Sequence, residues 1–240
     1  MKAKTIVIML LVAFGWAAQS ANAAPSPLNG KHYQGIGKIK GQPIDCWVDL
    51  LFDDSDVEIN VSDTYRFATS YTAKTVGNKT TVSAKIPGSP AATFTSTDGG
   101  STLQGKLTLN GQAIDIWVLS VPAKLKHADK PAAELEKVVG DPDGYTAFVL
   151  IGLPNGQKMC ATSDFVFNAA DKSFNMTCDS PSIQKIFSTM HGSYRVDGNE
   201  LVMTDATGKT VRGTLYDDGY YIKVPMGSAS GITLSLVLIK

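Results

Sequence analysis

A twelve-residue stretch that occurs twice is the feature of this chain that most constrains its fold. Residues 41–52 (GQPIDCWVDLLF) return as residues 156–167 (GQKMCATSDFVF), and the opening of the pattern occurs again in residues 111–118 (GQAIDIWV). At a constant offset of 115, the identical residues of the first copy are Gly41, Gln42, Asp49, Phe52, Asp56 and Asn60. A second set matches at an offset of 108, and its first-copy members are Gly100, Thr102, Gly105, Leu107, Gly111 and Ile114. Shared glycines indicate shared tight turns, since such turns need positive φ. The chain is therefore predicted to contain two copies of one unit.

The first copy of the stretch has the alternation of a β-strand. One face carries the apolar side chains of Ile44, Cys46, Val48, Leu50 and Phe52. The other face carries Asp45, Trp47 and Asp49, because successive side chains of a strand point to opposite sides. Asn110 and Gly111 form the dipeptide preferred in a type I′ hairpin turn. Runs of this kind, divided by turn residues, predict an all-β protein.

The pattern divides the chain into segments. Residues 24–121 are predicted to be a first β domain, and residues 144–240 a second domain that repeats it. Residues 122–143 form a linker, in which 131–139 have the composition of a short helix with proline in its first turn. Residues 180–190 carry an N-cap, a proline and an apolar stripe at helical spacing. The prediction is two tandem, similar antiparallel β domains, each a small barrel or sandwich, with short helices in the linker and the second domain.

Residues 1–23 are predicted to be a signal peptide. Lys2 and Lys4 precede an apolar run at 5–16, and the small residues of 21–23 offer a cleavage site after Ala23. No cysteine stands at the end of the apolar run, so lipoprotein processing is not expected. No later segment has the length of a membrane span. We expect an exported protein, periplasmic or extracellular.

The charge balance argues against nucleic acid as a partner. Loss of the two leader lysines leaves 20 of the 22 basic residues against 22 acidic ones. Nucleic acids and anionic membrane surfaces attract proteins with a basic field, which this composition does not supply. The remaining partner classes are a small molecule, a glycan or another protein.

The hairpin order and spacing resemble those of exported lipocalin-like (calycin-like) barrel proteins. The two units begin with residues 33–39 (YQGIGKI) and 145–151 (YTAFVLI), and the resemblance covers most of the chain after the leader. It implies β-barrels. The Gly-x-Trp motif of true lipocalins is absent, so no binding residue is transferred from that family.

Three cysteines, at positions 46, 160 and 178, leave one disulfide open for consideration. Export would permit a bridge between Cys160 and Cys178. If Phe167 faces Phe174 across a hairpin, however, Cys178 meets residue 163, and Cys160 lies off register on the opposite strand face. A β-bulge could restore the pairing.

No catalytic, metal or cofactor motif is present. The histidines are His32, His127 and His191, and no two of them have a metal-ligand spacing. The nearest approach to a serine nucleophile motif, residues 227–231 (GSASG), has alanine at the position of the nucleophile. We predict no cofactor, no metal site and no enzyme.

The candidate binding residues are two tryptophans with neighbouring carboxylates. Asp45 and Asp49 flank Trp47 on one strand face, and Asp115 beside Trp117 repeats the arrangement. An aromatic ring between acids can stack on a sugar, and paired carboxylates can hydrolyse one. The competing interpretation is an amphipathic strand with a wet outer face, which alternation alone produces.

These observations predict an exported binding protein for a small apolar molecule or a glycan. The alternative is a structural or protein-interaction role, such as an inhibitor or an assembly subunit with solidly packed cores. Large inward residues such as Phe52, Phe165 and Phe167 favour that alternative, because they fill small barrels. A third hypothesis is a hydrolase that uses strand-borne carboxylates.

Overall fold

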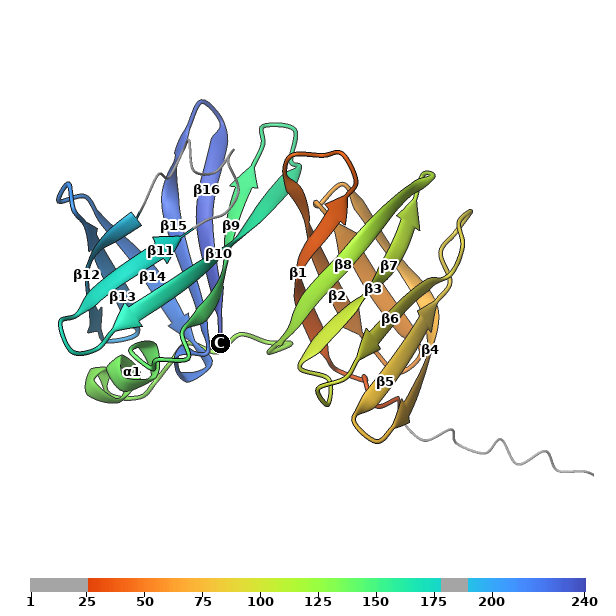
Figure 1. Cartoon of the computed structure of the whole chain (residues 1–240), viewed down its shortest axis with the longest axis horizontal. Helices are drawn as coiled ribbons and strands as arrows, with labels where there is room; N and C mark the ends of the chain where they lie inside the picture. Colours follow the sequence, from red (N-terminus) through yellow and green to blue (C-terminus); the bar gives the residue numbers. More distant parts are fainter. Residues whose placement is uncertain (1–25, 178–189) are drawn as a thin grey trace, which may run out of the picture.

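The computed structural model describes residues 26–177 and 190–240, so the predicted signal peptide lies outside the described residues. Most of the described chain is β-strand, and its one α-helix is short (Figure 1). Its first eight strands are β1 (His32–Ile39), β2 (Asp45–Phe52), β3 (Asp56–Val61), β4 (Tyr65–Val76), β5 (Lys79–Ala84), β6 (Ala92–Ser96), β7 (Thr102–Leu109) and β8 (Gln112–Val121). The later elements are α1 (Ala132–Val139), β9 (Tyr145–Gly152), β10 (Lys158–Asn168), β11 (Ser173–Thr177), β12 (Met190–Asp197), β13 (Glu200–Asp205), β14 (Thr210–Tyr216), the 3-10 turn η1 (Asp217–Gly219), β15 (Tyr221–Ala229) and β16 (Ile232–Ile239).

Strands β1 to β8 form a closed antiparallel barrel, which we call the first ring. Each strand pairs with the next one along the chain, and β1 pairs with both β2 and β8. The inward side chains of β2 are those that the alternation predicts, since Val48, Leu50 and Phe52 are fully buried in the apolar interior. At the hairpin between β7 and β8, Asn110 and Gly111 both have positive φ, as a type I′ turn requires.

Strands β9 to β16 have the same order of pairing, and we call them the second ring. Neighbours in sequence pair antiparallel, and β9 pairs with both β10 and β16. The predicted hairpin register is confirmed, because Phe167 lies opposite Phe174 and Phe165 lies opposite Met176. All four side chains are buried in the interior of the second ring.

The two rings pack the same aromatic pair in their interiors. The rings of Tyr33 and Phe52 are 5.8 Å apart at an angle of 86°, and those of Tyr145 and Phe167 are 5.8 Å apart at 87°. The two phenylalanines are the last residues of the repeated stretch, at the offset of 115. Edge-to-face geometry of this kind is the favoured arrangement of aromatic pairs.

The hydrogen bonds of these two tyrosines show that the predicted alignment at an offset of 108 needs correction. Tyr33 donates to the carbonyl of Gly100 at 2.9 Å, and Tyr145 donates to that of Gly219 at 2.7 Å. Each glycine precedes the seventh strand of its ring, β7 or β15. The offset of 108 instead matches Gly100 with Gly208, which precedes β14, the sixth strand of the second ring. That alignment was wrong because glycines with positive φ recur at many hairpin turns and do not identify one turn.

The rings lie side by side and are joined by strand pairing (Figure 1). Near the start of β10, Met159 lies opposite Cys46 and Cys160 lies opposite Asp45 of β2. Outward side chains of β1, β2 and β8 pack there against those of β9, β10, β15 and β16. Their buried members are Ile36, Trp47, Val121, Phe148, Leu150, Cys160, Tyr221, Val237 and Ile239. This apolar cluster between the rings is what positions the candidate site.

The linker helix is confirmed as α1, which begins directly after Pro131. Its buried side chains, Leu135 and Val139, belong to the apolar core of the second ring. Within the residues that the structure describes, no helix combines the length and the apolar character needed to cross a membrane.

The predicted helix of the second domain, residues 180–190, lies almost wholly outside the described residues. Its last residue is described and is not helical, because Met190 opens strand β12. The next residue, His191, is also in β12. Both residues pair with β11, opposite Met176 and Asn175. Ladder hydrogen bonds to a neighbouring strand override the weak helical periodicity at this point.

Candidate ligand-binding cleft between the two rings

Both predicted tryptophans lie where the rings meet. Trp47 is only 5% exposed, and its ring is 5.4 Å from that of Phe148 at an angle of 74°. Trp117 is half-buried and lies 6.1 Å from the same phenylalanine. The interpretation of a wet outer face is therefore wrong for Trp47, because the second ring covers it.

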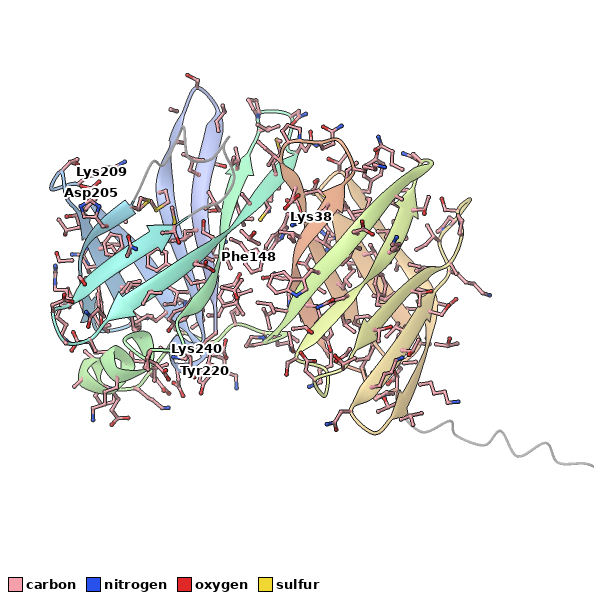
Figure 2. All side chains as sticks on the ribbon, in the orientation of Figure 1. Lys38, Phe148, Asp205, Lys209, Tyr220 and Lys240 are labelled. Atoms are coloured by element: carbon pink, nitrogen blue, oxygen red, sulfur yellow. The ribbon has the colours of Figure 1, made fainter. Side chains whose placement is uncertain are left out.

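A cleft of about 570 Å³ opens beside this aromatic cluster. Its lining residues come from the first ring or its loops and from strands β9 to β11: Ile36, Lys38, Pro43, Ile44, Asp45, Trp117, Thr146, Cys160, Ala161, Thr162, Ser163, Asp164 and Thr177. Figure 2 shows Lys38 on the first ring and Phe148 at the junction of the rings. A volume of this size is within the range of small-molecule sites, which combine apolar walls with a few polar groups.

Three charged groups line the cleft, and they come from both rings. Lys38 is at the end of β1, Asp45 opens β2, and Asp164 lies on β10. Burial raises the pKa of Asp45, and the charge of Lys38 opposes that shift without cancelling it. With the hydroxyl groups of threonines on β9, β10 and β11, the cleft presents both donors and acceptors next to the indole of Trp117.

Asp49 is not a lining residue of this cleft but the centre of a hydrogen-bond network between the rings. Its carboxylate contacts His32 Nε2 at 2.7 Å and accepts from the Gln34 amide at 3.0 Å. Tyr221 of the second ring donates to the side-chain amide oxygen of Gln34 (Oε1) at 3.0 Å. Burial lowers the pKa of His32, but the hydrogen bond and charge of Asp49, with the carbonyl of Pro122, raise it more, so the net shift is upward. The network ties β1 and β2 to β15.

Asp115 is not among the lining residues of the cleft. It faces Lys106 on the neighbouring strand, and the two side chains form an ion pair of 3.6 Å with exposed fractions of 80% for the lysine and 67% for the aspartate. Exposed pairs of this kind contribute about 0–1 kcal/mol. Asp115 shares the strand face of Trp117 and lies opposite Lys38 of β1, so it stands next to the cleft without being one of its lining residues.

The predicted disulfide stays a prediction, since Cys178 lies outside the described residues. Cys160 is fully buried in the cluster between the rings. Cys46 faces the interior of the first ring, where its thiol donates to the Gly37 carbonyl at 3.0 Å. Burial raises the pKa of the Cys46 thiol to about 11, so it is an unreactive neutral group at ordinary pH.

Among the described residues, no group of three or more His, Cys, Asp and Glu side chains is placed to hold a metal ion. His127 lies 5.0 Å from the ring of Tyr216 and within 3.4 Å of Asn199. His32 is engaged by Asp49. These contacts give the two histidines structural partners.

The sequence analysis did not identify Phe148, Lys38 or Asp164 as residues of a site. A signal for Phe148 exists, because residues 147–151 are apolar at every position, which indicates a strand buried on both faces. Asp164 could have been found as the counterpart of Asp49 at the offset of 115. For Lys38 no pattern in the sequence distinguishes it from other strand-end lysines.

Comparisons of the chain with protein families, with curated proteins and with solved structures find no match. The arguments about function therefore rest on the site.

Proposed function

We propose that the protein is an exported, non-enzymatic binding protein whose ligand lies in the cleft between the rings. The observation that carries this proposal is the composition of that cleft. The indole of Trp117 stands beside Lys38, Asp45 and Asp164 in a space of about 570 Å³. A site of this kind suits a polar ligand that also has an apolar face.

Of the two ligand classes that the sequence suggests, the glycan fits this cleft better. Sugars have one face of C–H groups that stacks on an indole, and their hydroxyl groups need donors and acceptors around the rim. The cleft supplies carboxylates, an ammonium group and threonine hydroxyls for that rim.

An apolar ligand carried inside the first ring is disfavoured by packing. Its interior is occupied by large side chains with exposures below 2%, among them Tyr33, Phe52 and Phe94. Phe165 and Phe167 occupy the interior of the second ring in the same way. Eight-stranded barrels are just wide enough for side chains or for one small ligand, and here side chains take that volume.

The test is a fluorescence titration with a panel of soluble oligosaccharides. After loss of the leader, Trp47 and Trp117 are the only tryptophans, and Trp47→Phe leaves Trp117 as the single reporter. A binding glycan should change its emission, and Lys38→Ala and Asp164→Asn should weaken that binding. Asp197→Asn is the matched control, because this exposed carboxylate at the end of β12 is not a lining residue of the cleft. Equal affinity in all three variants would place the ligand elsewhere.

The alternative function is a structural or protein-interaction role, and the filled interiors favour it. Such a protein needs no ligand in the cleft and acts through its outer surface. Native mass spectrometry of the protein purified from its exported fraction separates the two. A retained small molecule supports the binding protein, whereas a bare chain in a defined assembly supports the interaction role.

The hydrolase hypothesis has one observation in its favour. Asp45 and Asp164 line the same cleft, and a carboxyl with a raised pKa, as Asp45 has, can act as a general acid. Turnover of a bound glycan that is lost in Asp45→Asn, with binding retained, would establish this function in place of the first.

We further infer that the two rings are tandem, similar domains of lipocalin-like type, 24–121 and 144–240, behind a cleaved signal peptide. The matched Tyr–Phe pairs and tyrosine–glycine hydrogen bonds of the two rings support the duplication. The mass of the exported protein tests the leader, since cleavage after Ala23 removes residues 1–23.

A further inference from the structure

The methionines of this chain are concentrated in one ring. Of seven methionines, two belong to the predicted leader. The other five are Met159, Met176, Met190, Met203 and Met226, and all of them are on strands of the second ring. The first ring fills its interior without methionine. If methionine served only to fill gaps in an apolar interior, it would be expected in both rings, so this distribution calls for a reason specific to the second ring.

Three of the five line one small cavity inside the second ring. Met176, Met190 and Met226 enclose it together with Val149, Ser235 and Leu236. Its volume is about 10 Å³. That is close to the space occupied by one water-sized sphere, so the cavity has room for a single atom.

The fold brings these three methionines together from three strands, two of which are consecutive. Met176 of β11 lies directly opposite Met190 of β12, and directly paired side chains have Cβ atoms about 4.5–5.5 Å apart. Met226 comes from β15, where the register with β16 shifts between Pro225 and Gly227. Met176 is buried, and the other two are half-buried, so the cavity lies near the surface of the apolar interior.

The chemistry of this lining selects one class of ion. Thioethers are soft, neutral ligands that prefer Cu(I), and Ag(I) has the same closed-shell, soft character. Among the described residues, the six that line the cavity have no carboxylate, imidazole or thiol, so hard cations and zinc find none of their usual ligands in this set. A monovalent ion also suits an apolar surrounding better than a divalent one, because the desolvation cost of an ion rises steeply with its charge.

We propose that Met176, Met190 and Met226 form a binding site for a single Cu(I) ion within the second ring. The three side chains each have rotatable bonds that let the sulfur turn toward an ion in the cavity. The site is separate from the cleft between the rings and does not depend on the function proposed for that cleft.

The test uses Ag(I), a probe without redox chemistry, and the methyl groups of the methionines themselves. In the purified protein with ¹³C-labelled methionine methyl groups, one equivalent of silver nitrate in chloride-free buffer should shift the signals of Met176, Met190 and Met226. The signal of Met203 should stay in place, since this residue is buried in the same core but does not line the cavity. Single Met→Leu variants assign the signals.

Affinity gives the second readout, by competition of Cu(I) against a chromogenic chelator under reducing conditions. Loss of an outer-shell partner alone weakens metal binding by about 10–100-fold, so Met176→Leu or Met226→Leu should cost at least about tenfold. Met203→Leu is the matched control and should keep the wild-type affinity. Leucine and methionine have similar volumes, so these variants should fold.

The pH dependence distinguishes thioethers from other soft ligands. Thioethers do not take up protons in this range, so the affinity should be unchanged from about pH 7 to pH 5, whereas thiolate or imidazole sites weaken as the pH falls. Silver that binds without moving the three methyl signals, affinity that survives the triple Leu variant, or loss of affinity toward pH 5 would each overturn the proposal. Absence of Cu(I) and Ag(I) binding would do so as well.

Discussion

Replacement of Phe148 by alanine should reduce the free energy that couples the two rings. The side chain is fully buried in the cluster between the rings, and it contacts Trp47 at 5.4 Å and Trp117 at 6.1 Å between ring centroids. A buried Phe→Ala change costs about 3–5 kcal/mol, and this figure includes two aromatic pairs of about 0.5–1.5 kcal/mol each. Both of these aromatic pairs cross the boundary between the rings, so their loss should fall on the free energy that couples the rings.

Urea unfolding followed by tryptophan fluorescence measures this loss directly, because both tryptophans of the described chain lie at that boundary. We expect a lower midpoint and, in the folded variant, emission shifted to longer wavelength as water reaches the indoles. The control is Val166→Ala, whose side chain is 48% exposed and should change stability by no more than about 0.5 kcal/mol. If Phe148→Ala costs less than about 1 kcal/mol and leaves the emission unchanged, the rings do not depend on this cluster and the reasoning fails.

The remaining predictions concern two buried tyrosines and the half-buried His32. The Tyr194 hydroxyl is buried without a hydrogen-bond partner among the described residues, so Tyr194→Phe should be neutral or stabilising, by up to about 1–3 kcal/mol, in thermal unfolding. Tyr145→Phe should instead destabilise by about 1 kcal/mol, because it removes the 2.7 Å bond to the Gly219 carbonyl; equal effects of the two changes would contradict this. The pKa of His32 is raised in the folded protein, where the Asp49 contact outweighs burial, so its stabilising contribution is full below the ordinary pKa of 6.5 and is lost as the pH rises through the folded value. The melting-temperature advantage of the wild type over His32→Gln should therefore shrink from pH 6 to pH 8, and a constant or growing advantage would show that the sign is wrong.

The interiors of the rings could be predicted from the sequence because one-sided burial leaves a strong alternating signal. Residues 44–52 show that alternation, and the structure places Cys46, Val48, Leu50 and Phe52 inside the first ring, whereas Ile44 precedes β2 and lines the cleft. The hairpin register of Phe167 and Phe174 followed from the same rule, since a slip of one residue would turn every side chain to the other face. Local rules of this kind act between neighbours in the chain, and the sequence records them.

The junction between the rings could not be predicted in this way. A strand whose outer face is covered by another part of the protein has the same alternation as a strand facing water, so Trp47 carried no sign of its burial. The pairing of β2 with β10 joins residues more than a hundred positions apart, and only two residues of each strand take part. The cavity of Met176, Met190 and Met226 was missed for a related reason, because three strands bring together residues that share no spacing in the chain.

The position of the cleft follows from how the two rings meet. The faces in contact come from β1, β2 and β8 on one side and from β9, β10, β15 and β16 on the other, and all but β15 are corresponding strands, as in the self-complementary contact of a twofold dimer. Two identical faces would give an equally lined contact on both sides of the axis. In this chain the interiors match, but at the offset of 115 Trp47 corresponds to Thr162 and Asp45 corresponds to Cys160. The two rings therefore differ where they touch, and an indole at one position with a small hydroxyl at the corresponding position leaves the junction unevenly filled. An open cleft with charge from both rings is the physical consequence, which is why we place ligand binding between the barrels and not within the first of them.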